Sequence, residues 1–504
     1  MSEATRQVGN AVFWSVFART GRFILSLASG VIVVRGLGSH DYGVLSLVRT
    51  ILTFSAIIAG AGLGQALLKF LPALRVSKDA QGAVRLVRRV AAVQALIWIV
   101  LVAATYYSRH ALGQLFQFER FQALGEIICI AVALSLFELF FNLVAHILMA
   151  HYDTKRLSMA AIINHVIFIA LLLVLIPAGG GVLGVLVAAA VGNLSSCVLL
   201  FSQTAGHFAA EGAGSPGPGI AGRRLFRFSL PFAAMGILNM IIWRQSETLF
   251  LAYYRSAVET GFFDLAYRLP QTMLEFVPGT VWPIIMAGFS EVYEKDASNL
   301  VIAIDKYYKV LFLLCAPICL FGITFGGKMI PILFGNEMVP AAVPTQVFFG
   351  IFTLSFFATP LSMSLYVMEK THINLLIGTM LAALNIGLDI VLIPRFGVPG
   401  AILPVGLVIA LSPFIYKRVL SRFLHDARIP YRYIGKCFLA SLPVLLLFPI
   451  VLRVDNIFEL AIAVAVGVFI LIISFKKLRV LGSEEVDLLG SIPVANRVLR
   501  FMSS

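Results

Sequence analysis

The sequence predicts an all-α, polytopic membrane protein with about fourteen transmembrane helices. The chain of 504 residues is 60% hydrophobic and only 13% charged, and its mean hydropathy is +0.94. A soluble domain could not bury that much apolar surface, whereas a helix crosses a bilayer with about 20 mostly apolar residues. The apolar runs are long and do not alternate, which favours helices over barrel strands. These runs are centred near residues 22, 57, 97, 136, 167, 191, 240, 272, 318, 353, 383, 409, 442 and 467.

The distribution of positive charge predicts the orientation. The chain has 39 Lys and Arg residues against 25 Asp and Glu residues, a net charge of +14. Such an excess could indicate a nucleic-acid-binding protein. Most of the basic residues, however, fall in alternate loops between the apolar runs, which is the positive-inside pattern of membrane proteins. We therefore expect both termini in the cytoplasm and no binding of nucleic acid.

An internal repeat divides the chain into two matched halves. The tetrad VLIP at 174–177 recurs at 391–394, and Asp41-Tyr42-Gly43 corresponds to Glu259-Thr260-Gly261 at nearly the same offset. Six helices in each half would give both halves the same orientation, so we expect two parallel six-helix lobes. We predict an N-terminal lobe at 1–205 and a C-terminal lobe at 225–430, joined by a cytoplasmic linker at 206–224 that is rich in Gly, Ala and Pro. Two further helices follow at 431–477, and a cytoplasmic tail at 478–504.

Five arginines lie inside apolar segments, in the opening helix pairs of the two halves. They are Arg19, Arg22, Arg49, Arg244 and Arg268. A charge near the bilayer centre costs several kcal/mol, so it normally faces a cavity or a partner. The planar guanidinium binds phosphate oxygens through two parallel hydrogen bonds. The arginines therefore predict a basic cleft between the two lobes that binds an anionic substrate.

Ion pairing is the alternative explanation for some of these arginines. Arg244 lies three residues before Glu247, and Arg268 lies four residues after Asp264, so each pair could be structural or could open when a phosphate binds. Two further embedded carboxylates, Glu138 and Glu275, have no basic neighbour on their own helices. A buried carboxylate of that kind can carry a proton. The candidates for coupling transport to a proton or a sodium ion are Glu138, Glu247, Asp264 and Glu275.

Several stretches of the chain resemble a known family, beginning with the loop after the first predicted helix. They read RGLGSHDYGVLSL at 35–47, LFRFSLPF at 225–232, GFFDLAYR at 261–268, WPI and FSEVY within 282–293, and LNIGLDIVLIPRFGVPG at 384–400. Together they resemble the O-antigen type polysaccharide flippases of the multidrug/oligosaccharidyl-lipid/polysaccharide (MOP) exporter superfamily. The resemblance covers the first twelve predicted helices.

The resemblance implies a V-shaped pair of lobes with alternating access to a cleft lined by the helices that carry the arginines. It also implies a function, the flipping of an undecaprenyl-pyrophosphate-linked oligosaccharide from the inner to the outer leaflet of the bacterial cytoplasmic membrane. The cargo would be a repeat unit of O-antigen, capsule or exopolysaccharide, and a proton, a sodium ion or the membrane potential would drive its transport. Membrane lipid, a polysaccharide polymerase and glycosyltransferases are the implied partners of a monomer.

Other functions stay open on the sequence alone. A drug or cation antiporter of the same superfamily would have the same fold, but five embedded arginines favour an anionic substrate. An oligosaccharide polymerase or ligase would need a sizeable outer loop, and the predicted outer loops are short. No nucleophile–base pair, metal-ligand spacing or nucleotide-binding loop stands out in the sequence, so we expect neither an enzyme nor a cofactor.

Overall fold

The computed structural model describes residues 3–77, 79–116, 118, 123–151, 153–211, 220–243, 246–296, 299–424, 428–451 and 453–480. Within these ranges every regular element is an α-helix or a 3-10 helix, and turns connect them. The predicted all-α class is confirmed. The helices divide between two compact units, Met1–Gly261 and Phe262–Ser504.

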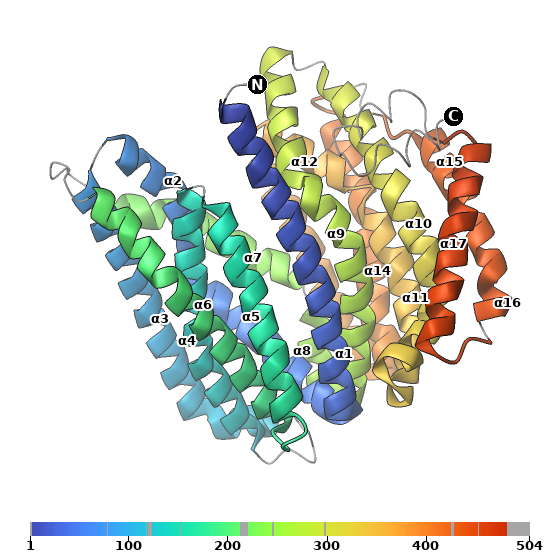
Figure 1. Cartoon of the computed structure of the whole chain (residues 1–504), viewed down its shortest axis with the longest axis horizontal. Coiled ribbons are helices and arrows are strands. Elements are labelled where there is room, and N and C mark those ends of the chain that lie inside the picture. The colour runs from blue at the N-terminus through green and yellow to red at the C-terminus, as the bar shows by residue number, and fades with distance from the viewer. Residues whose placement is uncertain are drawn as a thin grey trace. The chain divides into compact units, whose positions relative to one another are not determined.

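In the first unit, α4 lies between α3 and α6, and α5 packs along α1 and α6. Figure 1 shows α3, α4 and α6 side by side. The helices of this unit are α1 (Glu3–Gly60), α2 (Leu63–Val76), α3 (Ala80–Leu115), α4 (Leu124–Ala150), α5 (Thr154–Leu175), α6 (Gly181–Glu211), α7 (Gly222–Trp243) and α8 (Ser246–Tyr254). The first turn of α9 (Ala257–Lys295) also belongs to it.

The rest of α9 lies in the second unit, where α10 is the central helix. Helices α11, α15 and α17 all pack against α10. The elements after α9 are α10 (Leu300–Phe334), η2 (Asn336–Ala341), α11 (Ala342–Ser355), α12 (Thr359–Val367), α13 (Thr371–Phe396), α14 (Val398–Leu420), α15 (Tyr431–Ser441), η3 (Leu442–Leu447), α16 (Phe448–Val451) and α17 (Ile457–Lys477). The last four cover the two helices predicted after the second lobe.

Eleven helices among the described residues are long and apolar enough to cross a membrane, or twelve if the bent pair α7–α8 is one span. The predicted count of fourteen is not confirmed. The first of these spans, Thr20–Arg75, has 56 residues. At 1.5 Å per residue that is about 84 Å, well over the thickness of a hydrocarbon core of about 30 Å. Helix α9 is not among the eleven, although its 39 residues are long enough for a crossing.

Glycines interrupt the first long helix at two places. Gly38 has φ 74° and ψ 177°, which breaks α1 inside the predicted first loop. Ala61 and Gly62 then have φ 45° and 66° where α1 ends and α2 begins. Positive φ costs glycine little, whereas a side chain disfavours it. A Cβ on Gly62 would also overlap the carbonyl oxygen of Ser229, so this turn lets the backbone of α7 approach closely.

The two triplets paired by the internal repeat meet in the first unit. A Cβ on Gly43 would overlap the carbonyl oxygen of Ala257, the first residue of α9. A Cβ on Gly261 would lie 3.0 Å from the carbonyl oxygen of Ser39 and 3.1 Å from the nitrogen of Gly43. Only glycine permits backbones to approach this closely. The second part of α1 and the first turn of α9 therefore touch backbone to backbone at equivalent positions of the repeat.

An aromatic cluster fixes α9 against α11 in the second unit. Phe263 and Tyr267 of α9 and Phe348 and Phe352 of α11 are all buried. The ring centroids of Tyr267 and Phe352 lie 4.8 Å apart, and those of Phe263 and Phe348 lie 5.6 Å apart, both in edge-to-face geometry. Such pairs contribute about 0.5–1.5 kcal/mol beyond the burial of their surface. The cluster holds one side of α9 in place and thereby fixes the rotation of the helix about its axis.

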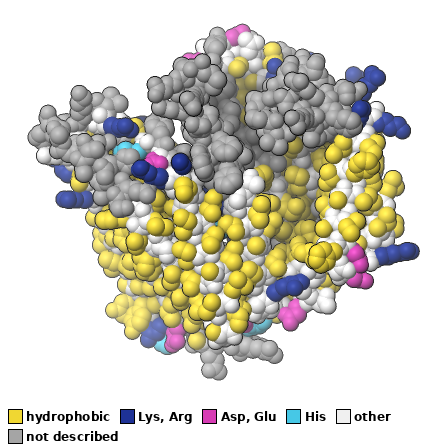
Figure 2. Space-filling model, in the orientation of Figure 1, with side chains coloured by type: hydrophobic (Ala, Val, Ile, Leu, Met, Phe, Trp, Pro, Cys, Tyr) yellow, Lys and Arg dark blue, Asp and Glu magenta, His cyan; other side chains and the backbone are white. Residues whose placement is uncertain are grey.

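The outer surface of the helices suits a hydrocarbon environment. Apolar side chains cover the middle of the face in Figure 2, and Lys and Arg side chains lie toward its borders. On α3, Leu96, Ile99 and Val100 are each more than half exposed. Exposing apolar surface to water costs about 25 cal/mol per Å², a cost that lipid removes. The exposed apolar helices therefore indicate a multi-pass membrane protein.

The predicted domain limits fall only partly on described residues. Helix α6 continues to Glu211 and α7 begins at Gly222, so helices enter both ends of the predicted linker 206–224. Residues 212–219 of that linker and the tail after Val480 lie outside the described residues. The division into two six-helix lobes with a linker and a tail stays a prediction.

The glycine contact predicts opposite effects of alanine at two positions of α1. Gly43→Ala should lower stability by about 1–3 kcal/mol, the usual cost of overpacking, because the new methyl group overlaps backbone. Gly30→Ala should leave stability unchanged or raise it by up to about 1 kcal/mol, since no atom lies within 4 Å of that Cβ position. Thermal unfolding of both variants in detergent measures the difference. Equal midpoints for the two variants would contradict the close contact.

Candidate functional site

Helix α9 carries a polar face in the second unit. Asp264, Arg268, Gln271 and Glu275 are spaced by four, three and four residues, which places them in one line on a helix of 3.6 residues per turn. Asp264 is fully buried, Arg268 is half-buried and Glu275 is exposed. This set, the α9 polar face, therefore leads from the protein interior to an accessible surface.

The ion pair predicted between Asp264 and Arg268 is present. The Arg268 Nε–H donates to both carboxylate oxygens of Asp264, at 2.7 and 2.9 Å. No surface of the Asp264 side chain is exposed, whereas 41% of the Arg268 side chain is. A buried carboxylate without partners would be strongly destabilising, and this contact gives both oxygens of Asp264 a hydrogen-bond donor. It also fixes the guanidinium, which has five N–H donors in all, with part of its surface accessible.

A hydrogen bond extends the same face. The Gln271 side-chain amide donates from Nε2 to Oε1 of Glu275, at 3.0 Å. Glu275 was a candidate from the sequence, whereas Gln271 was missed. The spacing of four residues on one helix was the available signal, since side chains at that distance are neighbours. Among the residues that the structure describes, the predicted site residues Asp264, Arg268 and Glu275 thus share one face of α9.

Helix α4 has a polar face of its own in the first unit. Glu138, Asn142 and His146 follow one another at intervals of four residues, and Glu138 is half-buried. The His146 Nδ1–H donates to the carbonyl oxygen of Asn142, at 2.6 Å. A Cβ on Gly64 would touch the His146 ring, so this side of α4 faces α2. We call these three residues the α4 polar face.

The structure describes the side chains of some of the remaining predicted site residues, which differ in exposure. The Arg22 side chain is exposed on α1, and it forms no ion pair with a described residue of its own unit. Arg49 is half-buried, and Glu247 at the start of α8 is fully buried. The side chain of Arg19 and all of Arg244 lie outside the described residues, so the predicted pair of Arg244 with Glu247 is not tested.

The chain belongs to the family described as "Polysaccharide biosynthesis protein", whose family model matches residues 32–344. This match covers well over half of the chain and includes the repeat-related triplets, the α4 polar face and the α9 polar face. The resemblance to a polysaccharide-biosynthesis family is thereby confirmed. Proteins with a similar sequence or fold carry the names of flippases or transporters, which agrees with the expectation that the chain is not an enzyme.

One curated relative is "Probable low-salt glycan biosynthesis flippase Agl15" from Haloferax volcanii. It is 22% identical over 255 residues, which are 49% of this chain and 53% of the relative. The matched segment thus spans about half the length of that protein. The likeness supports the family assignment, and the relative's activity is carried to this chain only as a proposal.

Two solved structures have a similar fold at low sequence identity. "Lipid II flippase MurJ, inward closed conformation" gives a TM-score of 0.73 at 15% identity, over 92% of this chain and 98% of MurJ. An inward-facing multidrug resistance MATE family transporter of the MOP superfamily gives 0.64 at 15% identity, over 81% of this chain and 98% of the transporter. At these identities the likeness shows the fold alone, and both structures confirm the predicted MOP-exporter architecture.

A double-mutant cycle would measure the coupling of Asp264 with Arg268. Asp264→Asn and Arg268→Gln should each destabilise the protein, and the double variant should lose less than their sum. Coupling in a buried pair of this kind is about 0.5–3 kcal/mol. The matched control is Asp305 with Lys309, which has the same spacing and a 3.2 Å contact but is partly exposed on both sides. That control should give only about 0.2–1 kcal/mol.

The cycle is read from denaturant or thermal unfolding in one detergent. A coupling for Asp264 and Arg268 no larger than that of the control pair would show that the buried contact does not stabilise the fold. Strict additivity of the single variants would show the same.

Proposed function

We propose that this protein is a flippase for a lipid-linked oligosaccharide that carries a phosphate or pyrophosphate group. The observation that carries the proposal is the α9 polar face, on which a buried carboxylate holds an arginine that is still 41% exposed. An arginine in this setting is a ready ligand for phosphate oxygens, because the guanidinium forms charged, bidentate hydrogen bonds with them. Family membership supports a role in polysaccharide biosynthesis.

The proposed cargo is an undecaprenyl-pyrophosphate-linked repeat unit of O-antigen, capsule or exopolysaccharide. A sugar-pyrophosphate headgroup needs a polar path, since charged groups are costly in hydrocarbon. Arg268 is the proposed phosphate ligand in the second unit, and Arg22 and Arg49 are the proposed ligands on α1. Arg19 and Arg244 complete the proposed set from the sequence.

Alternating access is the proposed mechanism, with release at the outer leaflet of a bacterial cytoplasmic membrane. Both termini would then lie in the cytoplasm, as the basic loops indicate. The proposed working form is a monomer that receives its cargo from glycosyltransferases and delivers it to a polysaccharide polymerase. The pair of Asp264 with Arg268 would open as the phosphate binds and close again after its release.

A cation antiporter is the second candidate, because the fold also resembles a MATE family transporter. The carboxylates of Glu138, Glu247 and Asp264 are the residues that would serve such a function. The exposed guanidinium of Arg22 and the half-exposed guanidinium of Arg268 favour the anionic cargo instead.

Arginine substitutions in the full-length protein test the proposal. In liposomes, Arg268→Gln should lower the rate of leaflet transfer of an undecaprenyl-pyrophosphate oligosaccharide about tenfold or more. A hydrogen bond to a charged group contributes about 1.5–3 kcal/mol, and each 1.4 kcal/mol is tenfold. The control is Arg395→Gln, which removes the same charge from an exposed position at the end of α13. Arg22→Ala should abolish transfer while the protein stays folded.

Transfer by Arg268→Gln at the rate of the Arg395→Gln control would remove Arg268 from the binding site. Wild-type transfer by Arg22→Ala would do the same for Arg22. Thermal unfolding of each variant separates a loss of transport from a loss of folded protein.

The α4 polar face is the proposed site of ion coupling, with Glu138 as the group that takes up a proton or a sodium ion. Glu247, Asp264 and Glu275 are the further candidates. Glu138→Gln should make the transfer rate insensitive to an imposed proton or sodium gradient, because an amide neither titrates nor carries charge. Glu126→Gln, an exposed position in the first turn of the same helix, should keep the response to the gradient. An unchanged gradient response in Glu138→Gln would assign coupling to another group.

A further inference from the structure

A groove runs along the side of α4 that is opposite to its polar face. Helices α3 and α6 both pack along α4 but have few contacts with each other. A groove therefore lies between α3 and α6, with α4 as its floor. Phe140, Val144 and Ile147 line it from α4, and their positions on the helix lie roughly opposite to Glu138 and His146 at 3.6 residues per turn. The groove therefore opens away from the α4 polar face.

The dimensions of the groove suit one hydrocarbon chain. Its volume is about 530 Å³, within the range of about 300–1,000 Å³ that small-molecule sites usually have. Along α4 it extends from Phe137 to Ile147, which is about 15 Å at 1.5 Å per residue. A hydrocarbon core is about 30 Å thick, so this length equals about one leaflet. Apart from Arg88 and the thiol of Cys197, the lining side chains are all apolar.

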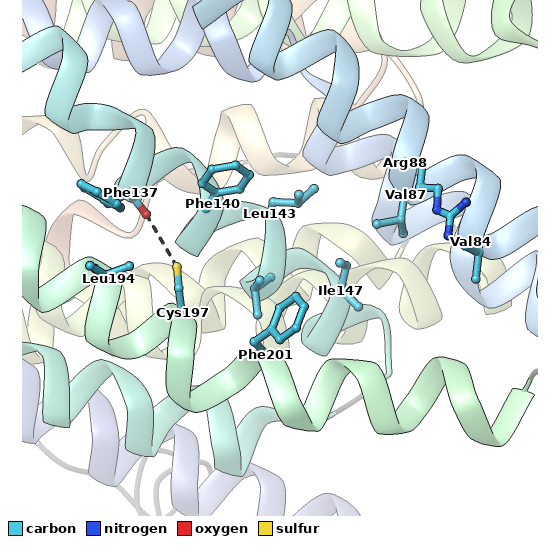
Figure 3. A pocket seen from close by; sticks show the side chains of 11 residues that line it. Val84, Val87, Arg88, Phe137, Phe140, Leu143, Ile147, Leu194, Cys197 and Phe201 are labelled. Carbon is cyan, nitrogen blue, oxygen red and sulfur yellow. Dashed lines mark hydrogen bonds between the residues drawn. The ribbon is translucent and has the colours of Figure 1, made fainter.

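The polar groups of the groove are placed unequally. Figure 3 shows Arg88 at one end beside Val84 and Val87, and Phe137 with Leu194 at the other end. At that second end, the Cys197 thiol donates to the carbonyl oxygen of Phe137, at 3.8 Å. The groove thus has a cationic end and an apolar body, the arrangement that an anionic amphiphile would match.

At the cationic end of the groove, the Arg88 side chain has no protein partner among the described residues of its unit. Its neighbours are engaged, since Arg89 donates from Nη1 to the carbonyl oxygen of Ile220 at 2.9 Å. Arg85 lies 4.0 Å from Asp79, whose carboxylate caps the first turn of α3. The Arg88 side chain is exposed. A phosphate there would meet the guanidinium of Arg88, the one arginine among the residues that line the groove.

We propose that this groove binds one acyl chain of an anionic phospholipid, whose phosphate lies on Arg88. The occupant belongs to the membrane leaflet at the N-terminal end of α3, the predicted cytoplasmic side. A phospholipid acyl chain matches the length of one leaflet, whereas an undecaprenyl chain is far longer than the groove. The proposal is independent of the transport function, because it concerns the opposite face of α4.

The test uses the purified full-length protein and two lipids with identical acyl chains, phosphatidylglycerol and phosphatidylcholine. Native mass spectrometry should show about fivefold preference for phosphatidylglycerol, and Arg88→Ala should abolish it. This figure follows from about 1 kcal/mol per arginine beside an anionic lipid. Arg223→Ala removes an exposed arginine of α7 that does not line the groove, and should keep the preference. Equal binding of both lipids, or an unchanged preference in Arg88→Ala, would overturn the proposal.

A second measurement locates the chain. Phosphatidylglycerol should slow alkylation of Cys197 by a maleimide several-fold more than phosphatidylcholine does, as read by peptide mass spectrometry. Cys129 lies on α4 outside the groove and is also half-buried, so its alkylation should not depend on the lipid. Equal protection of both cysteines would overturn the assignment of the groove. Displacement of phosphatidylglycerol by undecaprenyl phosphate at equal concentration would assign the groove to a prenyl chain and also overturn the proposal.

Discussion

The cost of placing charge in hydrocarbon governs the arrangement of this protein. Asp264 has no exposed surface, and its carboxylate receives the Nε–H of Arg268 at 2.7 Å. Without such contacts a buried carboxylate would be too costly to keep its charge. The aromatic contacts of α9 with α11 serve the same end, because they fix the rotation of the helix and thereby the direction in which its line of charged side chains points. A helix with these residues scattered around its circumference would expose charge to lipid.

The same constraint explains why two helices of different units each have two distinct faces. On α9 an aromatic face packs into the protein, and a separate face carries the carboxylates, the amide and the arginine. On α4 a polar face containing Glu138 and His146 lies toward α2, and an apolar face lines the groove on the other side. Glycines permit two close approaches near these helices, at Gly64 to the His146 ring of α4 and at Gly43 to the first turn of α9. The polar side chains of each of these faces are thereby grouped on one side of the helix, apart from its aromatic or groove-lining side chains.

Composition and periodicity predicted the class of fold, because each crossing helix needs a long apolar run that few other structures share. The ion pair on α9 was also predictable, since its two residues are four apart on one helix. Gln271, the hydrogen-bond partner of Glu275, was missed because an uncharged residue does not stand out in a search for charge. The exposure of Arg22 and the depth of Glu247 could not be predicted, since both depend on which neighbouring helix covers each side chain. The groove was equally hidden, because the apolar residues that line it look like any lipid-facing surface until α3 and α6 are placed beside α4.

Recognition of a negatively charged lipid-linked glycan is the property on which the proposed function depends, and a single comparison decides it. The wild-type protein would be reconstituted in liposomes, and its transfer of an undecaprenyl-pyrophosphate oligosaccharide would be measured beside that of a lipophilic cation. We expect rapid transfer of the pyrophosphate lipid between leaflets and no transport of the cation above protein-free liposomes. Transport of the cation without transfer of the pyrophosphate lipid would contradict the proposed function and would identify the protein as a cation exporter.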